Sequence, residues 1–179
     1  MSAALKILPN YTYDDYVHWE GKWELIDGFP IAMSPSPLPK HQRIAAMLRS
    51  EFTVALKNCK KCFAYDPIDF KVNESTILQP DISIICGKPT KAFIDFPPVL
   101  VVEVLSPSTA LRDRHTKYGI YEEQGVKYFL IVDGDKEKIE VYKLVDGKYE
   151  LQEYNDNEPF HFIFDEGCDA DILFSEIWE

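Results

Sequence analysis

The sequence lacks any run of about 18 consecutive apolar residues, which is the length that a membrane-spanning helix needs. Its N-terminus also lacks the basic, apolar and small-residue regions of a secretory signal peptide. We therefore expect a cytoplasmic protein with no membrane partner. The 179 residues are 46% hydrophobic, which suits a single domain over residues 1–179 with a core of its own.

Cysteine is scarce, with four in the whole chain. Cys59 and Cys62 form a CxxC motif, but no second pair follows at the spacing of a zinc ribbon, and Cys86 and Cys168 stand alone. A metal or redox role for the motif remains open. The sequence favours ordinary reduced thiols.

An excess of positive charge is also missing, because the net charge is −11. The imbalance is local: residues 1–132 hold 15 acidic and 15 basic residues, and residues 133–179 hold 15 acidic residues and 4 lysines. The charge excludes broad electrostatic adhesion to a polyanion, but it leaves room for a DNA substrate in the balanced part of the chain.

The periodicity of apolar residues predicts one α/β domain around a mixed sheet. The first half contains a short helix capped by Thr12, a hairpin that turns at Asp27-Gly28, and a long amphipathic helix. Their ranges are 12–20, 22–33 and 38–56, with a proline-rich loop at 34–39 and strands at about 63–72, 81–86 and 98–105.

The second half begins with a helix that ends before Gly125, followed by an apolar strand. Strand, helix and strand with short connections predict a parallel crossover unit. The ranges of these and the later elements are helix 112–124, strand 127–133, an added C-terminal hairpin of 137–144 and 148–154, strand 160–164, and a helical turn near 170–178.

One acid interrupts a strand that otherwise reads as buried on both faces, in VVEVLSPST at residues 101–109. A buried, unpaired carboxylate costs several kcal/mol, so Glu103 needs a partner or must reach water at the end of the sheet. If strands 81–86 and 98–105 form an antiparallel hairpin, paired residue numbers sum to about 184, which places Asp81 opposite Glu103. Two carboxylates that meet there favour Mg²⁺ or Mn²⁺ between them, unless the register is a coincidence.

These residues carry a resemblance. Pro80-Asp81 and then Glu103 on the next strand resemble the PD-(D/E)xK restriction-endonuclease-like superfamily, and within it a large bacterial family of endonuclease-like proteins of unknown biological role. The matching stretches are ELIDG (24–28), MSPSP (33–37) with His41, QPD (79–81), VVEVLSPST (101–109), Asp113, Lys117, Tyr121 and GVKYFLIVD (125–133). The resemblance implies a mixed sheet flanked by helices.

The chain departs from the superfamily pattern at one position. A lysine is expected two residues after the acid, and Leu105 stands there. The resembling family takes its lysine from the following helix, and the candidate is Lys117. Asp113, Lys117 and Tyr121 share one helix face, although an exposed Asp–Lys pair would show the same spacing.

Three further residues are supporting candidates. Glu24 would complete the metal shell, or would be a solvated residue on an edge strand. His41 would contact phosphate, or would only cap and pack the long helix. Gln79 would orient the Asp81 carboxylate.

We therefore expect a Mg²⁺- or Mn²⁺-dependent endonuclease that hydrolyses DNA, with Asp81 and Glu103 on the metal and Lys117 stabilising charge. The alternatives are a catalytically inactive nucleic-acid-binding or interaction module of the same fold, and a hydrolase of small phosphorylated substrates. We expect the acids of residues 133–179 to face away from the Asp81–Glu103 site, so that DNA can approach it. We also expect a homodimer, in which Phe160, Phe162 and Phe164 would cover a partner unless they complete the core of the monomer.

Overall fold

The computed structural model describes residues 8–33, 38–107, 110–165 and 167–178. Most of the predicted 34–39 loop and of MSPSP, and the last two residues of VVEVLSPST, lie outside these ranges. The described residues contain no helix that is long and apolar enough to span a membrane.

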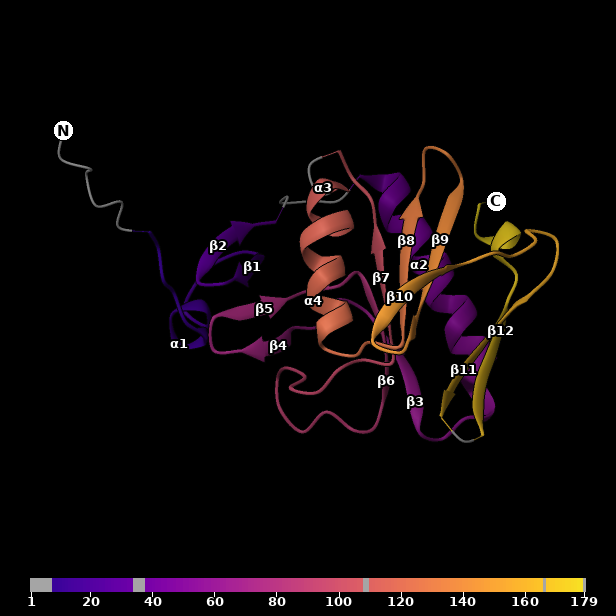
Figure 1. The fold of residues 1–179 in the computed structure, drawn as a ribbon, viewed down its shortest axis with the longest axis horizontal. Helices are drawn as coiled ribbons and strands as arrows, with labels where there is room; N and C mark the ends of the chain where they lie inside the picture. Colours follow the sequence, from indigo (N-terminus) through magenta and orange to yellow (C-terminus); the bar gives the residue numbers. More distant parts are fainter. Residues whose placement is uncertain (1–7, 34–37, 108–109, 166, 179) are drawn as a thin grey trace.

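A six-stranded mixed sheet forms the centre of the molecule, in the order β10-β9-β8-β7-β6-β3 (Figure 1). β7 and β8 are parallel and are joined by a helical segment, as predicted; the other neighbours are antiparallel. The strands are β3 (Cys62–Tyr65), β6 (Ile82–Cys86), β7 (Leu100–Val104), β8 (Tyr128–Asp133), β9 (Lys138–Val145) and β10 (Lys148–Gln152). The helical segment comprises α3 (Ala110–Arg112), the π-helical turn η2 (Asp113–Lys117) and α4 (Tyr118–Glu123).

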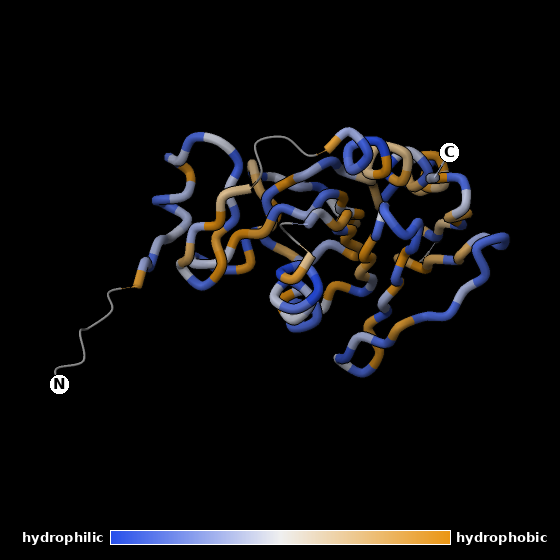
Figure 2. The backbone as a smooth tube through the Cα atoms, turned by 90° about the horizontal axis from the view of Figure 1, so that it is seen from above, coloured by the Kyte–Doolittle hydropathy of each residue, from blue (hydrophilic) through white to orange (hydrophobic). Residues whose placement is uncertain are grey.

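Both faces of this sheet are covered, which explains the apolar runs in its strands. α2 (Pro39–Ala55) packs on one face together with the hairpin of β11 (Phe160–Asp165) and β12 (Cys168–Ile172). α4 packs on the other face through Tyr121. Figure 2 shows the hydrophobic stretches concentrated in the central strands, with hydrophilic ones along the outer loops.

A smaller sheet, in the order β2-β1-β5-β4, extends from the N-terminal region. Its strands are β1 (Trp23–Ile26), β2 (Phe29–Ala32), β4 (Phe70–Asn73) and β5 (Thr76–Leu78), and α1 (Tyr13–Tyr16) precedes them. The β1–β2 turn is the predicted one: Asp27 and Gly28 have φ of 49° and 78°, and a Cβ on Gly28 would lie 2.8 Å from Asn10 Oδ1. This tight turn sets the register of β1 against β2, and with it the position of Glu24 on β1.

Two predicted elements differ from the structure. The single strand expected at 63–72 is two strands in different sheets, β3 and β4, because Asp66-Pro67 interrupts it, and the short β5 was not predicted. The helical turn expected near 170–178 is present as η3 (Phe174–Ile177), but it begins later than predicted, because the residues up to Ile172 belong to β12, which pairs with β11. Alternating burial along β12 marks it as a half-buried strand.

The C-terminal phenylalanines complete the core of the chain itself. Phe162 and Phe164 are buried against Phe52 of α2, with ring centroids 5.5 and 6.4 Å from the Phe52 ring. These rings therefore give no support to the homodimer, which stays a prediction that light scattering can decide.

The prediction of reduced thiols is wrong for this structure. Cys59 is bonded to Cys168, and Cys62 to Cys86. The spacing of the cysteines in the sequence could not predict these disulfides. Cys62 and Cys86 meet because β3 pairs with β6, and Cys59 and Cys168 meet because β12 packs beside η1 (Leu56–Asn58).

Candidate active site

Glu103 lies in the middle of the molecule and does not reach water, since only 3% of it is exposed. Its Oε1 accepts hydrogen bonds from Lys117 Nζ at 2.8 Å and from the Tyr121 hydroxyl at 2.7 Å. Both donors come from the helical segment that connects β7 to β8. The acid in the apolar strand is therefore paired, and its partners are two residues that the resemblance singled out.

Lys117 points from its helix into a group of carboxylates. Its Nζ lies 2.7 Å from Glu24 Oε1 and 3.6 Å from Asp113 Oδ1, in addition to Glu103. Burial by itself lowers the pKa of Lys117, but the charges of Glu103, Glu24 and Asp113 outweigh it and raise the pKa above its ordinary value. Lys117 therefore remains an ammonium ion and cannot act as a general base near neutral pH.

The turn that carries Lys117 is unusual. Residues 113–117 form a π-helical turn between α3 and α4, with Asp113 at its start and Lys117 at its end, both buried. Such turns occur mostly as single insertions in α-helices and often lie at functional sites.

The surroundings of Glu103 do not favour its ionised form. Burial raises its pKa well above the ordinary value; the Lys117 charge opposes this, and the charges of Asp113, Asp81 and Glu24 reinforce it. One lysine thus does not balance the surrounding acids. A second cation near Glu103 would favour its ionised form.

Glu24 is fully buried, which rules out a solvated residue on an edge strand. Its Oε1 accepts the Gln79 backbone N–H at 3.0 Å, and Arg112 Nη2 lies 3.5 Å from Oε2. These contacts, together with Lys117, hold Glu24 as the partner of two cations. Arg112 was not predicted; its position beside Asp113 at the start of the helix was the available signal.

Asp81 lies where the predicted register places it. β6 and β7 pair with Ile82 opposite Val102, so residue numbers sum to 184 and Asp81 falls opposite Glu103, one step beyond the ladder. Asp81 Oδ2 accepts the Val104 backbone N–H at 2.8 Å and lies 3.2 Å from His41 Nε2.

His41 comes from the first turn of α2, and 14% of its side chain is exposed. Burial lowers its pKa, but the hydrogen bond and charge of Asp81 outweigh this and raise the pKa. His41 is therefore more than a packing residue, because it pairs with the Asp81 carboxylate. Both are partly exposed, whereas Glu103 and Lys117 are buried.

Gln79 does not have the predicted partner. Its side-chain Nε2 donates to Asp69 Oδ1 at 2.9 Å, and its backbone N–H serves Glu24, so the prediction that it orients Asp81 is wrong. The Tyr16 hydroxyl donates to the same Asp69 oxygen at 3.0 Å. Asp69 was missed by the sequence analysis because the register of β4 was not predicted.

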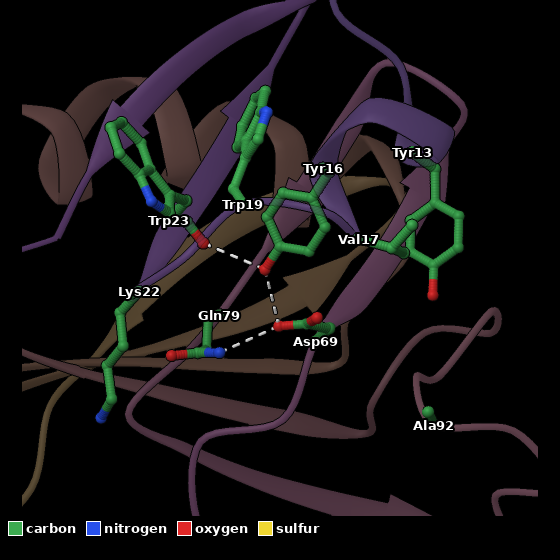
Figure 3. A pocket seen from close by; sticks show the side chains of 10 residues that line it. Tyr13, Tyr16, Val17, Trp19, Lys22, Trp23, Asp69, Gln79 and Ala92 are labelled. Atoms are coloured by element: carbon green, nitrogen blue, oxygen red, sulfur yellow. Dashed lines mark hydrogen bonds between the residues drawn. The ribbon is translucent and has the colours of Figure 1, made fainter.

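This Gln79–Asp69 pair forms one side of a pocket of about 330 Å³. Figure 3 shows the aromatic side chains that line the rest of the pocket, which come from α1, from the segment that follows it and from the start of β1. The lining side chains that carry rings or charge are Tyr13, Tyr16, Trp19, Lys22, Trp23 and Asp69. Gln79 therefore connects the aromatic pocket to Glu24 in the buried cluster.

A second hollow, of about 230 Å³, lies beside His41 and Val104. Asp133 and Asp135 also line it. The expectation that the acids of residues 133–179 face away from the site is therefore wrong for these two. Lysines accompany both of them: Lys136 Nζ is 2.9 Å from Asp133 Oδ2, and Lys40 Nζ is 3.5 Å from Asp135 Oδ1.

The donor set fits a hard divalent cation bound by few protein ligands. The site contains four acids (Glu24, Asp81, Glu103 and Asp113), and the charges of Lys117, Arg112 and cationic His41 offset three of them, which leaves one negative charge for such an ion to balance. In the part of the chain that the structure describes, no three carboxylates bring oxygens within 4.8 Å of one another. Magnesium suits such a site, since it is usually bound by one or two carboxylates plus water and substrate phosphate.

A mixed sheet with this crossover, and with Asp81, Glu103 and Lys117 at one end, belongs to the restriction-endonuclease-like class. Residues 13–162 match the family described as "Uma2: Putative restriction endonuclease", and the chain belongs to that family. An "uncharacterized protein slr1290" from Synechocystis sp. is 30% identical over 156 residues, covering 82% of this chain and 81% of the relative.

A solved structure supports the fold. The crystal structure of "a putative nuclease belonging to DUF820" from Anabaena variabilis superposes with a TM-score of 0.76 at 17% identity, covering 93% of this chain and 97% of that one. The predicted fold class is thus confirmed.

Proposed function

We propose that this protein is a Mg²⁺- or Mn²⁺-dependent endonuclease that hydrolyses phosphodiester bonds in DNA. The observation that carries the proposal is the buried contact of Lys117 with Glu103, beside Asp81, at one end of the central sheet. This arrangement supplies an acid–acid–lysine set even though Leu105 occupies the superfamily's lysine position.

Asp81 and Glu103 would hold the cation, which when bound would polarise the scissile phosphate and acidify a water molecule. Tyr121 and Lys117 both donate to Glu103 Oε1, so they fix the carboxylate, and the cation would be held through its other oxygen. Glu24 holds the Lys117 ammonium in place, and Lys117 stabilises the negative charge that develops on the phosphate.

His41 is suited to contact a DNA phosphate. It lies next to Asp81 at the accessible side of the site, and its raised pKa favours the cationic form that attracts phosphate. A phosphate bound by His41 would therefore lie beside Asp81 and close to the buried carboxylates.

The test is a plasmid-nicking assay with Mg²⁺ or Mn²⁺ on the wild-type chain, on Glu103→Gln and on the matched control Glu123→Gln, an exposed residue of α4. We expect nicks with 5′-phosphate ends from the wild type and the control, complete loss with a chelator, and at least a hundredfold slower cleavage by Glu103→Gln, in line with the loss of transition-state charge stabilisation. DNA binding without cleavage would favour the inactive module, and phosphate release from nucleotides alone would favour the small-substrate hydrolase.

The aromatic pocket is suited to hold a base next to the scissile phosphate, because unstacked bases bind on aromatic side chains. Trp19→Ala would remove one of its rings; Phe63→Ala, an exposed ring on β3, is the control. Stacking contributes about 1–3 kcal/mol per base, so we expect roughly 5- to 150-fold weaker binding of single-stranded DNA by Trp19→Ala in fluorescence anisotropy. Equal affinities of the two variants would remove the pocket from the DNA path.

A further inference from the structure

The four cysteines lie together at the edge of the central sheet, and none of them belongs to the nuclease site described above. Cys59 and Cys62 flank the start of β3, Cys86 ends β6 directly opposite Cys62, and Cys168 begins β12. Three separate segments therefore contribute sulfur to one place.

The sulfur atoms of Cys59, Cys62 and Cys168 all lie within 4.8 Å of one another, and Cys86 is bonded to Cys62. A tetrahedral zinc site with Zn–S bonds of about 2.3 Å needs sulfurs about 3.8 Å apart. Cys59, Cys62 and Cys168 are thus close enough to share one ion once the disulfides are reduced, and Cys86, which lies outside this group of three, would join them by rotation of its side chain. An iron–sulfur cluster would need the four sulfurs spread around a larger core.

The backbone around Cys59 points two donors at its sulfur. The N–H groups of Lys61 and Cys62 donate to Cys59 Sγ, at 3.4 and 3.1 Å. Such donors stabilise a thiolate more than they stabilise a thiol or a disulfide sulfur, because they favour the charged form. This is the kind of outer contact that orients a metal ligand.

The positive charge around the cysteines also favours a metal bound by thiolates. A zinc ion with four thiolates carries a net charge of −2, and the motif lies in the sequence KNCKKC, where Lys57, Lys60 and Lys61 are exposed. Three lysines in the chain's locally basic stretch would offset that charge.

We propose that the reduced chain binds one Zn²⁺ ion through the thiolates of Cys59, Cys62, Cys86 and Cys168. Each disulfide takes up two electrons and two protons from a dithiol reductant to give two thiols, and zinc binding then displaces their protons. Soft thiolates favour zinc over the Mg²⁺ that suits the carboxylate cluster. The ion would fasten the β11–β12 hairpin to the nuclease core.

The test begins with the full chain, purified in the presence of a phosphine reductant and analysed for metal content and free thiols. We expect one zinc per chain, and a higher melting temperature with zinc than after chelation. Replacement by Co²⁺ should give the intense red-region absorption and thiolate charge-transfer bands of tetrahedral sulfur ligation.

Cys168→Ser should weaken zinc binding more than about tenfold, since even outer-shell substitutions cost 10- to 100-fold. Glu103→Gln is the control, because it alters the carboxylate cluster and should leave zinc content and the cobalt spectrum unchanged. A reduced wild-type chain with four free thiols and no zinc would overturn the proposal, as would iron with labile sulfide. The wild-type measurements decide the matter even if Cys168→Ser fails to fold.

Discussion

At the scale of single residues, the structure shows that Lys117 is buried. The helix spacing alone left open an exposed Asp–Lys pair, in which Lys117 would lie on the helix surface. In the structure only 2% of Lys117 is exposed, and its ammonium lies between Glu24 and Glu103. Lys117 therefore contributes to stability as well as to the proposed chemistry.

Lys117→Ala leaves two buried carboxylates without their shared cation. We expect it to lower the free energy of unfolding by about 3–5 kcal/mol, the usual cost of removing one partner from a buried ion pair. Urea titration by circular dichroism measures this, and the exposed Lys57→Ala should stay within about 0.5 kcal/mol of wild type. A variant as stable as wild type would mean that the acids are protonated or solvated.

Sequence reasoning succeeded where contacts follow from one ladder or one helix face. The β6–β7 register placed Asp81 opposite Glu103 from turn position alone, and the helix spacing placed Tyr121 below Lys117. It failed for Gln79, because the Asp69 that bonds its side chain depends on a strand with unpredicted register. The role of each site residue stays a prediction.

At the scale of elements, one ion pair ties the π-helical turn to the sheet. Arg114 Nη1 lies 2.8 Å from Glu140 Oε2 on β9, and the Tyr142 hydroxyl donates to the same oxygen at 2.7 Å. Burial alone would raise the pKa of Glu140, but the hydrogen bonds from Arg114 and Tyr142 outweigh it and lower the pKa.

A pKa that is lower in the folded chain than in the unfolded chain gives stability above the unfolded value of about 4.3, and this stability is lost as pH falls through the folded value. We expect Glu140→Gln to cost about 1 kcal/mol or less at pH 7, because the pair is partly exposed, and to cost progressively less below pH of about 4. Urea unfolding at several pH values measures the difference, with the exposed Glu150→Gln as control. A difference independent of pH would mean that the Glu140 charge is not what stabilises the contact.

The elements that sequence analysis missed share a physical cause. The π-helical turn has no periodic signature over five residues, and the short β5 is defined by its neighbours β1 and β4. β12 was not predicted, and its last residues were assigned to the helical turn near 170–178, although its apolar and acidic residues alternate, because its burial depends on α2, more than a hundred positions away. The residue pattern of a short segment cannot predict which distant segment will pack against it.

At the scale of the whole molecule, charge is distributed unevenly, and a small part of the acidic C-terminal third reaches the proposed substrate path. Asp133 and Asp135 line the hollow beside His41, whereas acids such as Asp156 lie at a different hollow between β9 and β10. Approach of a polyanion is therefore opposed locally, even though Lys40 and Lys136 offset the two acids.

Asp135→Asn should raise DNA affinity a few-fold at low salt, because it removes a carboxylate near the phosphate path, and the gain should vanish at high salt, where exposed charges are screened. Fluorescence anisotropy with labelled duplex DNA over a salt series measures this. Asp156→Asn is the control for net charge, and an equal gain from it would show that position does not matter.

The π-helical turn also has an evolutionary consequence. A single codon deleted from residues 114–116 would remove one residue from the turn and restore the regular α-helical hydrogen-bond ladder. Lys117 would then stand three residues after Asp113 instead of four, and because positions three apart in an α-helix share a face, its ammonium would stay near the carboxylates. Loss of the turn would thus preserve both the helix and the direction of Lys117, so the buried cluster can tolerate a change of one residue in the length of this segment.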